Sequence, residues 1–135
     1  MKISRQLLSQ IHQHLEAGYP NEACGVMLGK NGIITEIARA DNERTDSARN
    51  RYLIDPLVYR KIERDADRRA VQVLGIYHSH PDVPARPSQF DLDNAWPNLD
   101  YLIVSVVKGK AIEFHCWRLR DDRSAFDQEA VEILD

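Results

Sequence analysis

The sequence predicts an α+β fold, in which a mixed, mostly antiparallel sheet of about five or six strands carries two long helices and one short helix. Three observations support this class. The chain opens on a helical apolar pattern, a hairpin signal follows it, and apolar strand patterns then surround a second helical segment. No repeat, low-complexity tract or linker-like stretch interrupts the chain, so residues 1–135 are expected to form a single domain.

The first half of the chain predicts a helix and a hairpin. Apolar residues recur at the spacing of one helical face, namely Ile3, Leu7, Leu8, Ile11 and Leu15. Gly18 and Pro20 mark the end of this helix. Asn31-Gly32, a dipeptide that tolerates the positive φ angles of a tight turn, then separates strand patterns at 26–28 and 33–40. The polar stretch 41–51 is expected to be a loop.

The second half alternates between helices and strands. Asp55 caps and Pro56 begins a second helix, which is expected to run to about residue 70. Residues 71–77 form a strand, the prolines that follow hold a loop open, and Ser88 starts a short helix. The segment 101–107 is apolar enough for a central strand, and 111–119 is the last clear strand. The tail 121–135 is expected to add an edge strand at 130–134.

The composition is that of an ordinary globular protein, and it excludes several classes of function. Hydrophobic residues make up 43%, charged residues 29%, and the formal net charge is −3. No segment concentrates Lys and Arg, so no nucleic-acid partner is expected. Cys24 and Cys116 are too few for a disulfide framework and are expected to be buried thiols. Neither a signal peptide nor a membrane span is recognisable, which predicts a cytoplasmic protein without a membrane partner.

The pattern His-x-His occurs twice, with opposite meanings. Residues two apart on a helix point to nearly opposite sides, so His12 and His14 cannot converge on one ion, and we expect them to be solvated. Residues two apart on a strand face the same way, roughly 6.5 Å apart. The imidazoles of His78 and His80 can therefore meet at a point about 2 Å from each nitrogen, as zinc ligands do.

Asp91 is the candidate third ligand, because a catalytic zinc takes three protein ligands and keeps one open position. It follows the proline-rich loop at the start of a helix, where the helix dipole favours a carboxylate. The segment Ser88-Gln89-Phe90-Asp91 also has the pattern of a capping box, with Ser at the N-cap and an acid at N3. Taken alone, the segment favours the capping role.

The combined pattern resembles the JAMM (MPN-plus) family of zinc metalloproteases. His78-Ser79-His80-Pro81, followed by Ser88 and Asp91, is similar to the family motif H-S/T-H-P then S-x-x-D. The family's upstream E-x-x-G is matched by Glu22-Ala23-Cys24-Gly25, and a Tyr-x-Ile-Asp-Pro-like segment by residues 52–56. The resemblance covers roughly residues 3–119 and is closest to the small stand-alone prokaryotic members. It implies the cytidine-deaminase-like MPN architecture.

The resemblance also implies a role for each residue of the motif. His78, His80 and Asp91 would hold Zn²⁺, with water as the fourth ligand. Glu22 would act as the general base and then as the acid, although an isolated glutamate is more often a solvent-exposed loop residue. Ser88 would donate a hydrogen bond to the oxyanion. Cys24 has no evident base beside it and is expected to pack rather than react.

The implied activity is hydrolysis of the bond after the C-terminal glycine of a ubiquitin-like protein. A sulfur-carrier adduct that releases cysteine or a similar group is the first choice of substrate. An isopeptidase acting on lysine conjugates is the second. A non-catalytic MPN scaffold within a protein complex is the alternative from another class, and a DNA-repair-associated branch is a third option.

Overall fold

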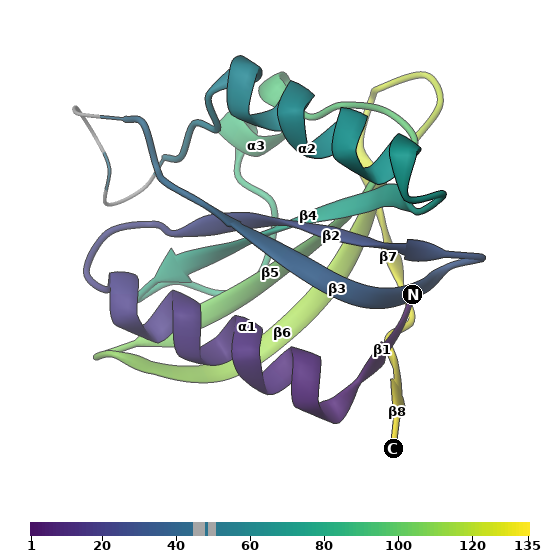
Figure 1. The fold of residues 1–135 in the computed structure, drawn as a ribbon. Helices are drawn as coiled ribbons and strands as arrows, with labels where there is room; N and C mark the ends of the chain where they lie inside the picture. Colours follow the sequence, from purple (N-terminus) through teal and green to yellow (C-terminus); the bar gives the residue numbers. More distant parts are fainter. Residues whose placement is uncertain (45–47, 49–50) are drawn as a thin grey trace.

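The computed structural model describes residues 1–44, 48 and 51–135 (Figure 1). Its elements, in chain order, are β1 (Lys2–Ser4), α1 (Arg5–Gly18), β2 (Cys24–Lys30), β3 (Ile33–Ala40), α2 (Pro56–Arg68), β4 (Gln72–Pro81), α3 (Gln89–Asn94), β5 (Asp100–Val107), β6 (Lys110–Leu119), β7 (Phe126–Glu129) and β8 (Glu132–Leu134). The described strands form one sheet in the order β7-β6-β5-β4-β2-β3-β1-β8. Four of its seven pairings are antiparallel, so the predicted mixed and mostly antiparallel sheet is confirmed.

Capping residues set where the long helices begin. Ser4 is the N-cap of α1, and its hydroxyl accepts a hydrogen bond from Leu7 N at 3.1 Å. Ile3 therefore lies in a strand, not in the helix as its spacing predicted. Asp55 caps α2 by accepting from Leu57 N at 2.9 Å, with Pro56 in the first helical position, as the sequence predicted.

The sheet has eight strands among the described residues, more than the five or six expected. The additional strands are short and lie at the two ends of the chain. Ile3 of β1 pairs with Ile133 of β8, and the N-terminal amine donates to Ala130 O at 3.0 Å. Pairing between opposite ends of a chain has no local signature, which explains why β1 was missed; the other additional strand, β7, pairs with β6. The expected edge strand within 130–134 is confirmed as β8, whereas a single domain over residues 1–135 stays a prediction.

Helices cover both faces of the sheet, with α1 on one face and α2 and α3 on the other (Figure 1). Because strand side chains alternate, each face has its own apolar core. Tyr77 of β4 belongs to the core under α1, and its neighbour Ile76 to the core under α2. The same alternation turns His78 and His80 toward the face that carries α2 and α3. Among the described residues, no helix has both the length and the apolar composition needed to cross a bilayer.

The two histidines of α1 have separate partners, and the expectation that both are solvated was wrong. The ring of His12 lies against Phe114 at 5.5 Å, and its Nε2 is buried. Nδ1 of His14 is hydrogen-bonded to the hydroxyl of Tyr77 at 2.7 Å. Burial lowers the pKa of both imidazoles. These rings flank the apolar stripe of a helix packed on a sheet, so they share its burial.

Candidate metal centre

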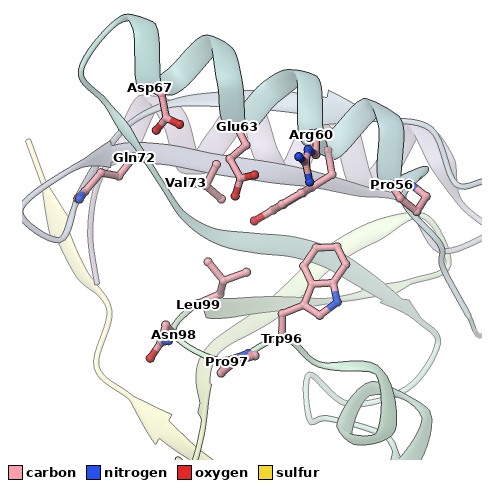
Figure 2. A pocket seen from close by; sticks show the side chains of 11 residues that line it. Pro56, Arg60, Glu63, Asp67, Gln72, Val73, Trp96, Pro97, Asn98 and Leu99 are labelled. Carbon is pink, nitrogen blue, oxygen red and sulfur yellow. The ribbon is translucent and has the colours of Figure 1, made fainter.

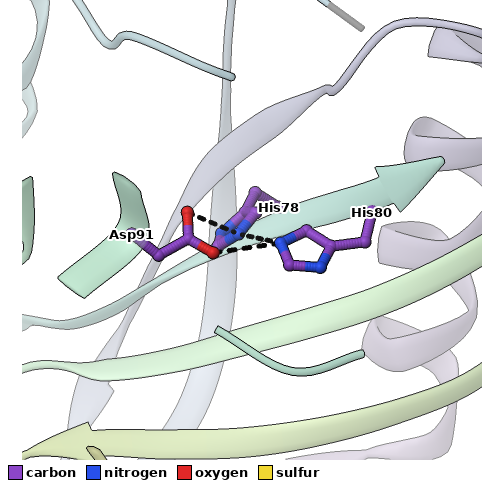
Figure 3. A group of neighbouring side chains, drawn as sticks. All are labelled: His78, His80 and Asp91. Carbon is purple, nitrogen blue, oxygen red and sulfur yellow. Dashed lines mark hydrogen bonds and ion pairs between the residues drawn. The ribbon is translucent and has the colours of Figure 1, made fainter. Parts of the chain in front are cut away.

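Three side chains from two elements converge on the α2 and α3 face (Figure 3). His78 Nε2 lies 3.2 Å from His80 Nε2 on β4. Asp91 enters from α3, with Oδ2 3.0 Å from His80 Nε2 and Oδ1 3.5 Å from His78 Nε2. All three residues are buried. The structure therefore brings together the three metal-ligand candidates that the sequence predicted.

The spacing and chemistry of these donors fit zinc. Ligands of a tetrahedral zinc at bond lengths of about 2.0–2.1 Å stand about 3.3 Å apart, close to the distances between these atoms. His80 Nδ1 lies 3.0 Å from Pro84 O, a carbonyl that can only accept, so Nδ1 is a ring nitrogen that carries a proton. Nε2 is the ring nitrogen turned toward Asp91, 3.0 Å from its Oδ2, and it is the nitrogen left to bind a metal.

Electrostatics keep the cluster in the protonation state that a metal requires. Burial is the largest influence on Asp91 and would raise its pKa. The two histidines and the Ser88 N–H outweigh burial and hold that pKa well below its usual range. Burial lowers the pKa of His78, which keeps its imidazole neutral. Deprotonated carboxylate and neutral imidazole are the forms that coordinate zinc.

The capping box at the start of α3 is present alongside this cluster. Ser88 Oγ accepts from Asp91 N at 3.1 Å, and Ser88 N donates to Asp91 Oδ2 at 2.9 Å. The carboxylate that caps the helix also reaches His80. The two roles that the sequence left as alternatives are thus compatible in one side chain, because a carboxylate oxygen has more than one lone pair.

Glu22 is buried with 5% of its surface exposed, contrary to the default expectation for a loop glutamate. Within the described structure its Oε1 has no hydrogen-bond partner. Its position is set by backbone contacts: Ala23 N donates to Ser79 Oγ at 2.9 Å, and Asn42 Nδ2 donates to Glu22 O at 3.0 Å. Burial, followed by repulsion from the Asp91 carboxylate, raises the pKa of Glu22 to about 9.

Three supporting residues have no role predicted from the sequence. The ring of Tyr52 stacks on His78 with centroids 4.4 Å apart. Pro84 offers its carbonyl to His80, and Asn42 Oδ1 accepts from Leu53 N at 3.0 Å, which organises the segment around Tyr52. A loop prediction carries no information about such contacts, since they join segments that are distant in sequence. Only the resemblance of residues 52–56 to a family segment singled out Tyr52.

Both cysteines are free and buried, as the composition predicted. Burial raises the pKa of each thiol to about 12. A thiol that stays protonated is a poor nucleophile. Cys24 is therefore a packed residue of β2, where it pairs with His78 of β4.

Two hollows lie on the same side of the sheet and differ in their relation to the metal centre. One, of about 240 Å³, includes Asp91 and Tyr52 in its lining, together with Arg44, Leu53, Ile54, Ile76, Phe90, Asn94, Trp96 and Tyr101. The other, of about 600 Å³, lies between α2 and the segment after α3, around Trp96 (Figure 2). None of the predicted site residues, all of which the structure describes, lines the second hollow, so it is not part of the centre.

Comparisons with known proteins agree with this geometry. A family model described as prokaryotic homologues of the JAB domain matches residues 4–120. A Thermus thermophilus protein named "Probable TtuB-protein conjugate cleaving protease" is 33% identical over 101 residues, 75% of this chain and 67% of that protein. A "CysO-cysteine peptidase" of Mycobacterium tuberculosis is 30% identical over 138 residues, 98% of this chain and 90% of that protein.

Solved structures have the same fold. A Salinibacter ruber protein solved in solution has a TM-score of 0.76 and 38% identity, covering all of this chain and 92% of that one. A structure titled "JAMM: A Metalloprotease-like Zinc Site in the Proteasome and Signalosome" has a TM-score of 0.61 and 21% identity, covering 100% and 98%. At that identity the second likeness concerns the fold alone.

Proposed function

This chain belongs to the family of prokaryotic homologues of the JAB domain, and from that premise we propose that it is a zinc-dependent hydrolase of ubiquitin-like conjugates. The bond cleaved is the one after the C-terminal glycine of the ubiquitin-like protein. The observation that carries the proposal is the convergence of His78, His80 and Asp91, three metal-binding side chains, beside a buried glutamate. Relatives named for cleaving conjugates of this kind support it.

In the proposed mechanism the residues of the chain bind the metal ion, transfer a proton and donate a hydrogen bond. His78, His80 and Asp91 hold the ion. When bound, zinc supplies positive charge that acidifies a water molecule and polarises the carbonyl under attack. Glu22 receives a proton from water at its carboxylate and returns one to the leaving nitrogen. Ser88 donates its hydroxyl proton to the carbonyl oxygen as that oxygen gains charge.

For Glu22, burial and an unpaired carboxylate oxygen are the supporting features. A carboxylate with satisfied hydrogen bonds is a weak proton acceptor, whereas Oε1 of Glu22 has no partner among the described residues. Burial raises the pKa of Glu22 to about 9, which makes its carboxylate a stronger proton acceptor than an exposed glutamate and lets it hold the proton that it later returns. An exposed glutamate would have neither property.

The proposed substrate is a sulfur-carrier protein whose terminal glycine bears cysteine or a similar adduct. The relative named a CysO-cysteine peptidase, which this chain matches over 98% of its length, favours that leaving group. Relatives named desampylases favour the second candidate, an isopeptidase that releases a lysine amine. A non-catalytic scaffold is the alternative from another class, but a scaffold role does not explain why three metal-binding side chains converge.

The test is incubation of the zinc-loaded chain with a ubiquitin-fold carrier ending in Gly-Gly-Cys, followed by mass measurement of the carrier. We expect loss of one cysteine residue from that carrier and little change in an Ala-Ala-Cys carrier, because a Cβ on the terminal residues hinders close approach of their backbone to the buried centre. The variant His78→Ala should lose zinc and activity, while the matched His12→Ala should keep both. Cleavage of neither carrier by zinc-loaded protein contradicts the proposal, and full zinc occupancy in a His78→Ala/His80→Ala double variant contradicts the ligand assignment.

A further inference from the structure

The hollow beside Asp91 has the size of a site for one small group. Its volume is about 240 Å³, and pockets for drug-sized ligands are generally larger, about 300–1,000 Å³. Its wall is mainly apolar and aromatic, and it shares Asp91 and Tyr52 with the metal centre. Among the described residues, Arg44 is the only basic one in its lining. Because Asp91 is a proposed metal ligand, a small group in this hollow would lie next to the bond that the proposed hydrolase cleaves.

Two guanidinium groups lie over Phe90, a ring that lines this hollow; Arg44 belongs to the lining as well, and Arg51 adjoins it through Phe90. The Cζ atom of Arg51 is 4.8 Å from the centroid of Phe90, and that of Arg44 is 5.5 Å from the same centroid. Phe90 lines the hollow and directly precedes Asp91 in α3. The aromatic face attracts each cation, but the two cations repel each other. Two guanidinium groups on one ring place positive charge beside the metal centre, which favours an anion there.

Arg51 has donors available for such an anion. Its side chain is exposed, and within the described structure no carboxylate lies at ion-pair distance from it. The contact with Phe90 places the guanidinium carbon over the ring face and uses no hydrogen bond from its N–H groups, which can therefore donate. A planar guanidinium matches the two oxygens of a carboxylate.

We propose that Arg51, together with Arg44, binds the carboxylate of the leaving group, so that the preferred substrate is a free amino acid joined through its α-nitrogen to the terminal glycine. This inference rests on the proposed function and specifies its substrate class. In such an adduct one carbon separates the scissile nitrogen from a carboxylate. A lysine isopeptide has no carboxylate there, because that of the lysine is an amide of the protein chain.

The reaction leaves this carboxylate unchanged. The bond between the glycine carbonyl carbon and the α-nitrogen breaks, the hydroxyl of water goes to the carbon, and a proton goes to the nitrogen. The amino acid then departs with a free amine and its original carboxylate. The two arginines therefore act on specificity and are not catalytic residues.

The test compares carriers that end in Gly-Gly-Cys with the same carriers ending in the cysteine amide. We expect wild-type kcat/KM to favour the acid by about 10- to 100-fold, the range of one charge-assisted hydrogen bond. Arg51→Gln and Arg44→Gln should reduce hydrolysis of the acid by a similar factor and leave that of the amide nearly unchanged. Arg64→Gln, an exposed arginine of α2 outside this hollow, is the matched control and should change neither.

A binding measurement separates this proposal from the proposed function. The zinc-loaded Glu22→Gln chain is titrated calorimetrically with the peptide Gly-Gly-Ser and with its C-terminal amide. Tighter binding of the acid that disappears on adding Arg51→Gln supports the carboxylate site, even if no carrier is cleaved. Equal wild-type cleavage of acid and amide overturns the proposal, as does equal binding. The proposal is also overturned if Arg51→Gln lowers kcat/KM by the same factor for the acid carrier and the amide carrier.

Discussion

Replacement of Ser88 separates two roles of one hydroxyl. Its Oγ accepts a hydrogen bond from Asp91 N at 3.1 Å, which caps α3. That bond uses a lone pair and leaves the hydroxyl proton free to donate. Because the side chain is exposed, a substrate oxygen can reach that proton. Capping and donation can therefore occur at the same time.

The two roles predict different patterns across variants. Ser88→Ala removes the cap and should lower the free energy of unfolding by about 0.5–2 kcal/mol. Ser88→Gly should lower it by only about 0.2–0.4 kcal/mol. If the hydroxyl also donates to the developing oxyanion, both variants should lose about 10²- to 10³-fold in kcat. Ser88→Thr keeps a hydroxyl and a cap, and it should retain most of both properties.

The assay combines urea unfolding with turnover of the Gly-Gly-Cys carrier at saturating zinc. Zinc content is measured for each variant, because Ser88 N also positions the Asp91 carboxylate. Wild-type turnover by Ser88→Gly would refute the oxyanion role and leave a residue that only caps. An Ala variant as stable as the wild type would instead refute the cost assigned to the cap.

Two further predictions concern buried ionisable groups. Glu22→Gln should keep its zinc by metal analysis but lose about 10²- to 10⁴-fold in turnover, because an amide takes no proton; loss of zinc would make Glu22 a ligand instead. For Cys116, burial raises the folded-state pKa to about 12 from the ordinary thiol value of 9.0. The folded chain then binds more protons than the unfolded chain between these values, so its free energy of unfolding should fall as pH rises above 9.0. Cys116→Val should reduce that fall in a pH series of urea unfolding and leave the share of Cys24, whose pKa burial also raises to about 12. Rapid alkylation of the native Cys116 thiol at pH 8 would contradict the burial.

The elements that the sequence predicted best are those with strong local signals. The helix begun by Asp55 and Pro56 and the hairpin turn at Asn31-Gly32 were confirmed. So was the central strand Asp100–Val107, because its apolar run is typical of a strand buried on both faces. Of the strands at the chain ends, β1 and β7 were missed and β8 was expected longer than it is. These strands are three or four residues long and exist only through pairing, β1 with β3 and β8 and β7 with β6.

Burial was the property that sequence patterns predicted least well. Glu22 and the two histidines of α1 are polar and have polar neighbours in the sequence, yet Glu22 is buried and both histidines are half-buried. What buries them is another segment: the loop that contains Asn42 for Glu22, and strands of the facing sheet for His12 and His14. The composition of a short segment does not indicate which distant segments will pack against it.

The sequence by itself determined that His78 and His80 share one face of a strand, since residues two apart in a strand always do. Only the tertiary structure decided that Asp91 completes the set. Its segment satisfied a capping box equally well, and only packing of α3 over β4 brings its carboxylate within 3.0 Å of His80. The tertiary structure also placed Arg51 and Arg44 on the ring of Phe90. The physical reason is the sequence separation of the contacts. Backbone geometry fixes how residues a few positions apart are placed, but a site depends on contacts between elements that are far apart in the chain, and no spacing rule predicts those.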